Sequence, residues 1–333
     1  MSIDTVPLIR ASQVRPLLAV IDHIGAPRER LLRESKLPLF AYDDAEAVFP
    51  ELFLWGLADK VVRSEGIEDL GLFAVTHTPV WQSEPEFTAR LQSSPTLWIA
   101  LSTFCRMTSQ FSTAVPFEVV RKGDQTLLQC GQHPSTPGKD QAELYDLQIM
   151  IQIIQLAAGR DWTPPKVYVS EVNIPRLARR KEFERVRIRP SNSVSCVVFP
   201  SDMLAWPMQA QAHPPPCELQ LPAPLNAAFL DSLSALIGTY LRYHTMNIQL
   251  AAEMAGLSIR TFQRRLRDLQ LDYSTLIDHV RLQRALSFLR DPSVLLTDIA
   301  YDLGYSDAAH FTRAFQRWTA LSPREYRRQT QAG

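Results

Sequence analysis

The sequence is poor in cysteine, and its cysteines show no metal-binding pattern. Its 333 residues contain four of them, Cys105, Cys130, Cys196 and Cys217, and no two stand in CxxC spacing. This scatter is typical of free thiols in a reducing cytoplasm. A disulfide or a metal site is the alternative that four cysteines leave open.

Long hydrophobic runs are also missing. The most apolar stretch, residues 147–159, is too short to span a bilayer and is interrupted by Gln152 and Gln155. The N-terminus has no basic segment followed by an apolar one, so it does not look like a signal peptide. We therefore expect a cytoplasmic protein with no membrane partner.

Catalytic signatures are absent. The sequence lacks GxSxG, GxGxxG, HExxH and the phosphate-binding pattern GxxxxGK followed by Ser or Thr. Some acidic residues gather in predicted loops without a recognisable partner: Asp43, Asp44, Glu46, Glu84 and Glu86. We expect no enzyme activity, no cofactor and no metal. The alternative is an enzyme in residues 1–206 that carries a DNA-binding appendage.

Neither sign of charge is in excess, because 35 Lys and Arg balance 35 Asp and Glu. The balance hides an asymmetry. Residues 225–333 contain 13 Arg, no Lys and 10 acidic residues, a net charge of +3. Residues 1–224 contain 22 basic and 25 acidic residues, a net charge of −3. This bias permits nucleic-acid binding by the last third of the chain without proving it.

Prolines divide the chain. Seven of them lie within residues 200–224, a density that excludes a helix and favours an extended segment. We predict a multidomain protein with a semi-rigid linker at 207–224, an α+β sensor or dimerisation domain at 1–206 and an all-α domain at 225–333.

The expected elements of the first domain follow from apolar spacing and turn residues. Helical spacing covers 50–64, 94–111 and 141–159. The two β-rich runs within 116–133 flank Lys122-Gly123-Asp124, which is typical of a hairpin. Residues 165–172 and 193–200 have strand patterns. Together these elements predict an α+β domain rather than an all-β barrel.

The last third contains an internal repeat. Residues 250–266 and 299–315 align at one offset of 49, which pairs Phe262 with Phe311 and Leu266 with Phe315. Each copy reads as a short amphipathic helix, a turn and a second helix that starts near Ser258 or Ser306/Asp307, which are good N-cap residues. Two such units predict two helix-turn-helix motifs.

The second helix of each copy has an apolar side and a polar side. Phe311, Phe315 and Trp318 are spaced to anchor one of these helices to the core. The opposite faces would present side chains suited to base edges, thymine methyl groups and phosphates: Arg260, Thr261, Gln263, Arg264 and Arg267 in the first unit, and Ala308, Ala309, Thr312, Arg313 and Gln316 in the second. The alternative is a pair of solvated helical hairpins.

These residues resemble the AraC/XylS family of transcriptional regulators. The resemblance spans about 225–330 and is strongest in 298–327, with its Ile-Ala start, Leu-Gly-Tyr-Ser turn and Ser-Pro-x-x-Tyr-Arg close. Residues 257–266 resemble the first recognition helix, and 278–289 the helix that joins the two units. The resemblance implies seven helices and two units on one DNA face.

By position, the resemblance implies base contacts from Arg260, Gln263 and Arg264, and base or phosphate contacts from the second unit. The remaining expected DNA contacts are Ser258, Thr261, Arg267, Ala308, Ala309, Thr312, Arg313, Arg317, Ser322 and Arg327. Two positions depart from the family pattern, since Gln270 and Ala320 replace its usual glycines. If these sites are left-handed, each non-glycine residue costs on the order of 1 kcal/mol.

The first domain resembles, more loosely, the "arabinose-binding" sensor domain of one branch of that family, a label that does not identify a ligand. The resemblance lies in 91–107, 159–169 and 183–208. Candidate ligand-binding residues combine an apolar wall with one cation: His77, Trp81, Trp98, Phe104, Arg106 and Phe111. The alternative is that the aromatic residues are core and His77 is structural.

Two further segments of this domain have alternative interpretations. Helix 141–159 has an apolar stripe wide enough to form a dimer seam, with buried core as the alternative. The basic stretch 176–185 fits a solvated helix, or a contact to DNA or an anion.

The sequence as a whole predicts a ligand-modulated transcriptional regulator. Its expected partners are double-stranded DNA, a second copy of the chain, a small-molecule effector and, from the resemblance, RNA polymerase. The alternative is a DNA-binding regulator whose first domain only dimerises or binds a partner. Activation and repression are both compatible with the sequence.

Overall fold

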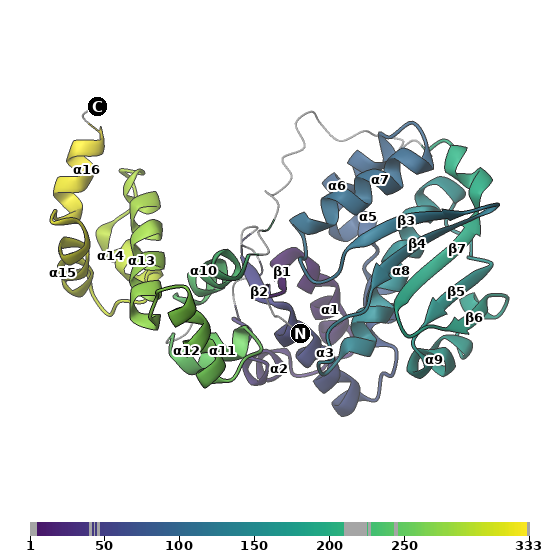
Figure 1. Cartoon of the computed structure of the whole chain (residues 1–333), viewed down its shortest axis with the longest axis horizontal. Coiled ribbons are helices and arrows are strands. Elements are labelled where there is room, and N and C mark those ends of the chain that lie inside the picture. The colour runs from purple at the N-terminus through teal and green to yellow at the C-terminus, as the bar shows by residue number, and fades with distance from the viewer. Residues whose placement is uncertain are drawn as a thin grey trace. The chain divides into compact units, whose positions relative to one another are not determined.

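The computed structural model describes residues 5–39, 42, 44, 47–209, 225, 228–242 and 246–331 (Figure 1). Contacts divide the chain into two compact units, one of residues 7–226 and one of residues 227–333 with residues 1–6. The first has helices, a two-stranded sheet and a five-stranded sheet, and the second is helical throughout its described part. Most of the predicted linker, 210–224, lies outside the described residues.

The first unit begins with helices that precede the main sheet. A short antiparallel pair joins β1 (Leu8–Arg10) to β2 (Val48–Pro50). The helices are α1 (Ala11–His23), α2 (Arg28–Glu34), α3 (Glu51–Glu65), α4 (Leu70–His77), α5 (Val80–Ser83), α6 (Pro85–Gln92) and α7 (Leu97–Met107), followed by a 3-10 turn at Thr108–Gln110. Thr96 caps α7 by accepting a hydrogen bond from Ile99 N.

The main sheet has five strands in the order β3-β4-β7-β5-β6. They are β3 (Phe117–Lys122), β4 (Gln125–Gly131), β5 (Lys166–Val169), β6 (Arg187–Pro190) and β7 (Val194–Pro200). All pairs are antiparallel except β5–β6. The predicted hairpin and the two predicted strands are therefore confirmed. The edge strand β6 escaped prediction because Arg187, Arg189 and Pro190 give it a polar pattern.

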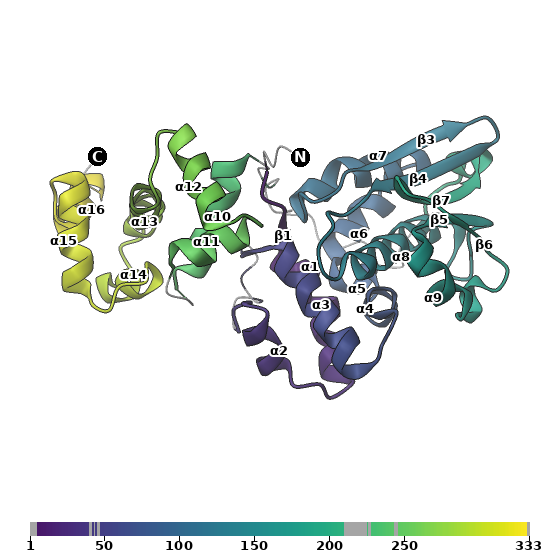
Figure 2. The same ribbon diagram turned by 60° about the horizontal axis from the view of Figure 1, so that its bottom comes forward.

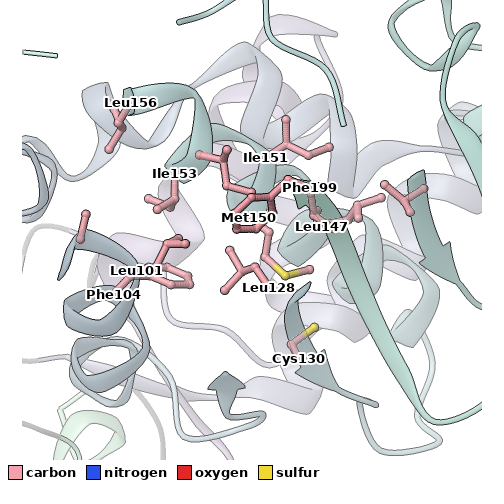
Figure 3. Close-up of a cluster of buried hydrophobic side chains, with 14 of the residues drawn as sticks. Leu101, Phe104, Leu128, Cys130, Leu147, Met150, Ile151, Ile153, Leu156 and Phe199 are labelled. Carbon is pink, nitrogen blue, oxygen red and sulfur yellow. The ribbon is translucent and has the colours of Figure 1, made fainter. Parts of the chain in front are cut away.

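Helix α8 (Lys139–Ala158) lies at the centre of this unit and packs on α4 and on the sheet. Figure 3 shows its apolar side chains converging with Leu101 and Phe104 of α7 and with residues of β4 and β7. Ile153 and Ile154 are fully buried there. The predicted dimer seam on this helix is wrong, because its own domain covers the stripe.

The basic stretch 176–185 is not one solvated helix. Helix α9 (Ile174–Ala178), preceded by a 3-10 turn at Glu171–Asn173, ends there, and a 3-10 turn follows at Lys181–Phe183. The reason is that Leu177 and Phe183 are both buried, which bends the chain toward the core. A last 3-10 helix, Ser201–Ala205, follows β7.

The second unit contains seven helices in its described residues, as the resemblance implied. They are α10 (Phe229–Tyr240), α11 (Ile248–Met254), α12 (Ile259–Asp268), α13 (Tyr273–Leu289), α14 (Leu296–Asp302), α15 (Ala308–Thr319) and α16 (Pro323–Gln331). Figures 1 and 2 both show the long α13 between the α11–α12 pair and the α14–α15 pair. Helix α13 contacts α10 and α16, so within this unit it links the two helix-turn-helix motifs.

The single offset of 49 between the repeats is correct only for their second helices. Helices α12 and α15 start 49 residues apart, but α11 and α14 span 248–254 and 296–302, an offset of 48. The left-handed glycines of the two turns, Gly256 and Gly304, also differ by 48. One residue separates Gly256 from the cap Ser258, whereas Tyr305 and Ser306 separate Gly304 from the cap Asp307. The second turn is therefore one residue longer.

No helix in the described part of the chain is long and apolar enough to cross a bilayer. Cys105, Cys130 and Cys196 are free thiols, and Cys217 lies outside the described residues.

Candidate functional sites

Helix α12 exposes a basic face whose N-terminus is fixed by a cap. Ser258 Oγ accepts a hydrogen bond from Thr261 N at 3.2 Å, so the first turn is held at one orientation. Arg260, Arg264 and Arg267 are exposed and recur at i, i+4 and i+7, which places them on one side of the helix. Gln263 is exposed beside them.

The opposite side of α12 holds the helix in the core. Phe262 is fully buried and Leu266 nearly so. The fourth arginine, Arg265, lies toward the body of the domain, with its guanidinium 4.2 Å from the centre of the Phe229 ring in α10. The basic face is thus presented by a helix that cannot turn about its axis without unpacking.

Helix α15 has the same construction with smaller outward side chains. Asp307 Oδ1 accepts a hydrogen bond from His310 N at 2.7 Å, and Phe311 and Phe315 are fully buried. Its other side presents Ala308, Ala309, Thr312, Arg313 and Gln316, of which Ala308 and Thr312 are half-buried and the others exposed. Within the described residues, Arg260, Arg264 and Arg313 make no ion pair.

Two of the arginines predicted to contact DNA, Arg317 and Arg327, bind other segments of the domain. Arg317 pairs with Asp278 of α13, with 2.8 Å between Nη2 and Oδ2, although its side chain remains 66% exposed. Arg327 Nη2 donates to Val294 O at 2.8 Å, which ties α16 to the segment before α14. These two cations already stabilise the fold and have fewer donors left for a phosphate.

An open groove runs beside helix α15, on the side that presents Ala308, Ala309 and Thr312. It is lined by residues from the starts of three helices: Leu295, Leu296, Thr297, Ala308, Ala309, Thr312, Ser322, Pro323, Arg324 and Arg327. Five of the residues predicted to meet DNA therefore border a hollow rather than a ridge: Ala308, Ala309, Thr312, Ser322 and Arg327. A DNA strand could approach this surface more closely than it could approach the arginine face of α12.

The two positions that replace family glycines are both left-handed. Gln270 follows α12 with φ 58°, and Ala320 ends α15 with φ 61°. An L-residue in this region is strained by its Cβ. Gly304 by contrast must be glycine, since a Cβ there would lie 2.7 Å from Leu241 O.

The first unit contains a cavity between α3, α7, α8 and the loop before β3. Its central void measures about 60 Å³, within about 640 Å³ of empty space that includes its opening to solvent. One wall is aromatic and apolar, with Phe87, Phe104, Phe111 and Phe117. The other wall is polar, with Gln13, Glu51, Glu84, His133 and Asp146.

A buried histidine joins two carboxylates in the polar wall. His133 Nε2 hydrogen-bonds Asp146 Oδ2 at 2.8 Å, and Nδ1 lies 3.1 Å from Glu51 Oε1 without pointing its proton at that oxygen. Burial disfavours the imidazolium, but the bond and charge of Asp146 and the proximity of Glu51 outweigh it and raise the pKa of His133 to about 10. The two neighbouring carboxylates thus favour the imidazolium, although burial also raises the pKa of Asp146.

Glu51 is held by Trp55, which donates from Nε1 to Oε1 at 2.7 Å. Its second oxygen, Oε2, is buried and accepts no hydrogen bond from the described residues. A buried carboxylate oxygen without a donor is costly. Nearby, burial raises the pKa of Glu84, whose Oε1 accepts from Gln13 at 2.7 Å.

The six predicted ligand-binding residues do not meet in one place. Phe104 and Phe111 line the cavity. Trp98 is 44% exposed, and Arg106 borders a separate surface hollow. The exposed His77 packs against His23 with tilted rings, 4.6 Å between ring centres. The side chain of Trp81 lies outside the described residues.

Sequence reasoning missed Glu51, His133 and Asp146. They are far apart in the chain and carry no spacing motif. The available signal was the pair of carboxylates, Glu143 and Asp146, among the apolar residues of helix α8. Among the described residues, no group of three or more His, Cys, Asp or Glu is arranged to hold a metal ion.

Comparison with known proteins identifies both regions. The family model of the arabinose-binding domain of AraC transcription regulators matches residues 25–208, and the model of a helix-turn-helix domain matches residues 251–329. The ornithine utilization regulator of Pseudomonas aeruginosa is 34% identical over 138 residues, 39% of this chain and 40% of that protein. The activator RhaS of Escherichia coli is 37% identical over 83 residues, 25% of this chain and 30% of that protein.

Among solved structures, the transcriptional regulator CdpR from Pseudomonas aeruginosa aligns over 94% of this chain and 97% of its own, with 18% identity and a TM-score of 0.39. The chain spans no more than about two fifths of the curated relatives described above. The arabinose-binding-domain model alone covers more than half of the 333 residues. The chain therefore belongs to the AraC family of transcriptional regulators.

Proposed function

We propose that this protein is a sequence-specific DNA-binding regulator whose two helix-turn-helix units read successive major-groove segments of one duplex. The observation that carries the proposal is the paired construction of α12 and α15. Each has a capped N-terminus, a buried phenylalanine anchor and an exposed polar face. Arginine and glutamine on such a face suit guanine and adenine edges.

The two units would contribute differently to binding. Arg260, Arg264 and Arg267 supply long side chains and positive charge from α12. The smaller residues Ala308 and Ala309 would let α15 lie close to the duplex, with Arg313 beside them. Two units on one face fit a site of two blocks separated by about one helical turn, roughly 34 Å.

Footprinting of the purified full chain on its host genome tests this function. We expect discrete protected sites that share a two-block motif, and we expect the Arg260→Ala/Arg264→Ala variant to lose one block. Arg290→Ala, an exposed arginine at the end of α13, is the matched control. Uniform coverage of the genome, with no shared motif, would refute a sequence-specific reader.

We propose further that the first unit, with boundaries near 1–206, binds a small effector in its cavity and thereby changes DNA affinity. The cavity supports this because it combines an aromatic wall with a few buried polar groups, the usual composition of a ligand site. A thermal shift of the full chain on ligand screening, accompanied by a change in DNA affinity, would be the supporting result. If no ligand changes DNA affinity, the result would favour the alternative, in which the first domain only dimerises or binds a partner.

Homodimerisation and contact with RNA polymerase belong to the same proposal. Helix α8 cannot supply the dimer surface, since its apolar stripe is core. Sedimentation equilibrium of the full chain tests the dimer, and a monomer at all concentrations would exclude it.

A further inference from the structure

We propose that the cavity of the first unit binds a small primary amine, whose ammonium group pairs with Glu51 and whose short apolar body packs on the phenylalanine wall. This inference rests on the proposed effector role of the cavity and names its ligand class. It draws on the charge of the polar wall, on one orphaned oxygen, and on the lining and size of the void.

The charge of the wall favours a cation. The cluster of Glu51, His133 and Asp146 carries one net negative charge when both carboxylates are ionised around the imidazolium. The Glu84 carboxyl lies in the same wall. An anionic ligand would have to face these groups in a poorly hydrated site, where like charges repel most strongly.

The orphaned oxygen calls for a hydrogen-bond donor. Glu51 is 3% exposed, lines the cavity, and leaves Oε2 without a donor among the described residues. Its Oε1 is already used by Trp55. An ammonium group carries several N–H donors, so one of them can satisfy Oε2 and form a charge-assisted bond.

The lining supports the same head group. Trp55, Phe87, Phe104, Phe111 and Phe117 all border the cavity. Aromatic faces attract ammonium ions as well as apolar carbon, so this wall accepts both ends of an amine. Thr108 and Ser112, which also line the cavity, offer further acceptor oxygens.

The volume limits the ligand. A void of about 60 Å³ holds only a few heavy atoms, since one water needs about 10–15 Å³ measured the same way. A short alkylamine is therefore expected to fit within the void, and a single-ring amine to extend into its opening, whereas a polyamine or a sugar is too large.

Titration calorimetry of the full chain tests the ligand class with an alkyl pair and an aromatic pair of probes, each pair similar in size. We expect n-butylamine and 2-phenylethylamine to bind, and 1-butanol and 3-phenylpropionate to bind at least about tenfold more weakly, because a bond to a charged group is lost. Equal or tighter binding of the alcohol or the carboxylate would overturn the inference, as would the absence of amine binding.

Variants locate the binding. Glu51→Gln, which keeps an acceptor for Trp55, should weaken amine binding about tenfold or more, whereas Glu65→Gln on the exposed end of the same helix should not. Val115→Trp should abolish binding by filling the cavity without changing any charge, which keeps the test valid if Glu51→Gln fails to fold. Unchanged amine affinity in Val115→Trp would place the site elsewhere.

DNA affinity measured with and without probe separates the two proposals. Amine binding that leaves DNA affinity unchanged would support the ligand class and contradict the effector role. A neutral or anionic compound that binds the cavity and changes DNA affinity would support the effector role and contradict the amine.

Discussion

The first helix-turn-helix unit exposes three long arginines on α12, whereas the second presents the small Ala308 and Ala309 on α15 and keeps Arg317 paired with Asp278. The frame beneath is similar, with a capped N-terminus and a fully buried phenylalanine in each recognition helix. The turns differ by one residue, and the caps by chemistry, Ser258 against Asp307. The comparison shows that both helices are anchored to the core in the same way, but that they present different surfaces to a partner.

The two buried phenylalanines, Phe262 and Phe311, should contribute equally to stability, and replacing them should have the largest effect on the free energy of unfolding. Phe262→Ala and Phe311→Ala should each lower the free energy of unfolding by about 3–5 kcal/mol, because each leaves a cavity in a packed core. Urea titration combined with peptide-resolved hydrogen exchange would measure the loss and its location. A much smaller loss for Phe311→Ala would mean that the second helix-turn-helix motif is held less rigidly than the first.

The next largest effect should come from removing arginines, whose contributions to DNA affinity should differ between the two helix-turn-helix motifs. Arg264→Ala should cost about 1–3 kcal/mol of binding to a cognate site and relax preference at one base pair. Arg317→Ala should cost less, since that guanidinium is already engaged by Asp278. Binding measured on the cognate site and on base-substituted sites checks both. Equal losses would show that the ion pair opens on DNA.

The left-handed residues should give a smaller effect in the opposite direction. Gln270→Gly and Ala320→Gly should each stabilise the domain by about 1 kcal/mol, because glycine adopts positive φ without strain. Thermal unfolding measures this as a raised melting temperature. An unchanged or lowered melting temperature would show that the side chain is worth more than the strain it brings.

The caps should give the smallest effect, visible only at low pH. The hydrogen bond from the His310 amide, together with the nearby His310 charge, lowers the pKa of Asp307. The stabilisation by this ionised cap is therefore present above the unfolded pKa of about 3.9 and is lost as pH falls through the lower folded value. Ser258 does not titrate, so the first turn of α15 should loosen before that of α12.

Hydrogen exchange of the two first turns between neutral and acidic pH would measure that difference. Asp307→Asn is the matched control, because asparagine caps a helix without titrating. If α15 still loosens first in this variant, the acid effect comes from other groups, such as Asp272, whose pKa is also lowered by its capping bonds.

Much of the helical C-terminal unit, residues 227–333, was predictable because local signals agree with one another there. Caps, apolar spacing and aromatic anchors each mark α12 and α15 within a short window of sequence. The extra residue in the second turn was not visible, since Leu250 pairs as plausibly with Ile299 as Ala251 does. Only the positive φ of Gly256 and Gly304 fixes the register of α11 against α14.

The first unit was predictable in its elements but not in its site. Hairpin and strand patterns are local, whereas the cavity depends on the packing of α3, α7, α8 and the segment after β4. Glu51, His133 and Asp146 meet only through that packing. Trp98 was a reasonable pocket candidate by residue type, but its place on α7 leaves it 44% exposed.

The central claim is that α12 and α15 contact the same face of one duplex at once. Missing-base interference on a cognate site, with Arg264→Ala and Arg313→Ala compared to the parent chain, tests it most directly. We predict that each variant loses sensitivity in a different block, and that the two blocks lie about one helical turn apart. Loss in the same block for both variants, or blocks on opposite faces of the duplex, would contradict the account.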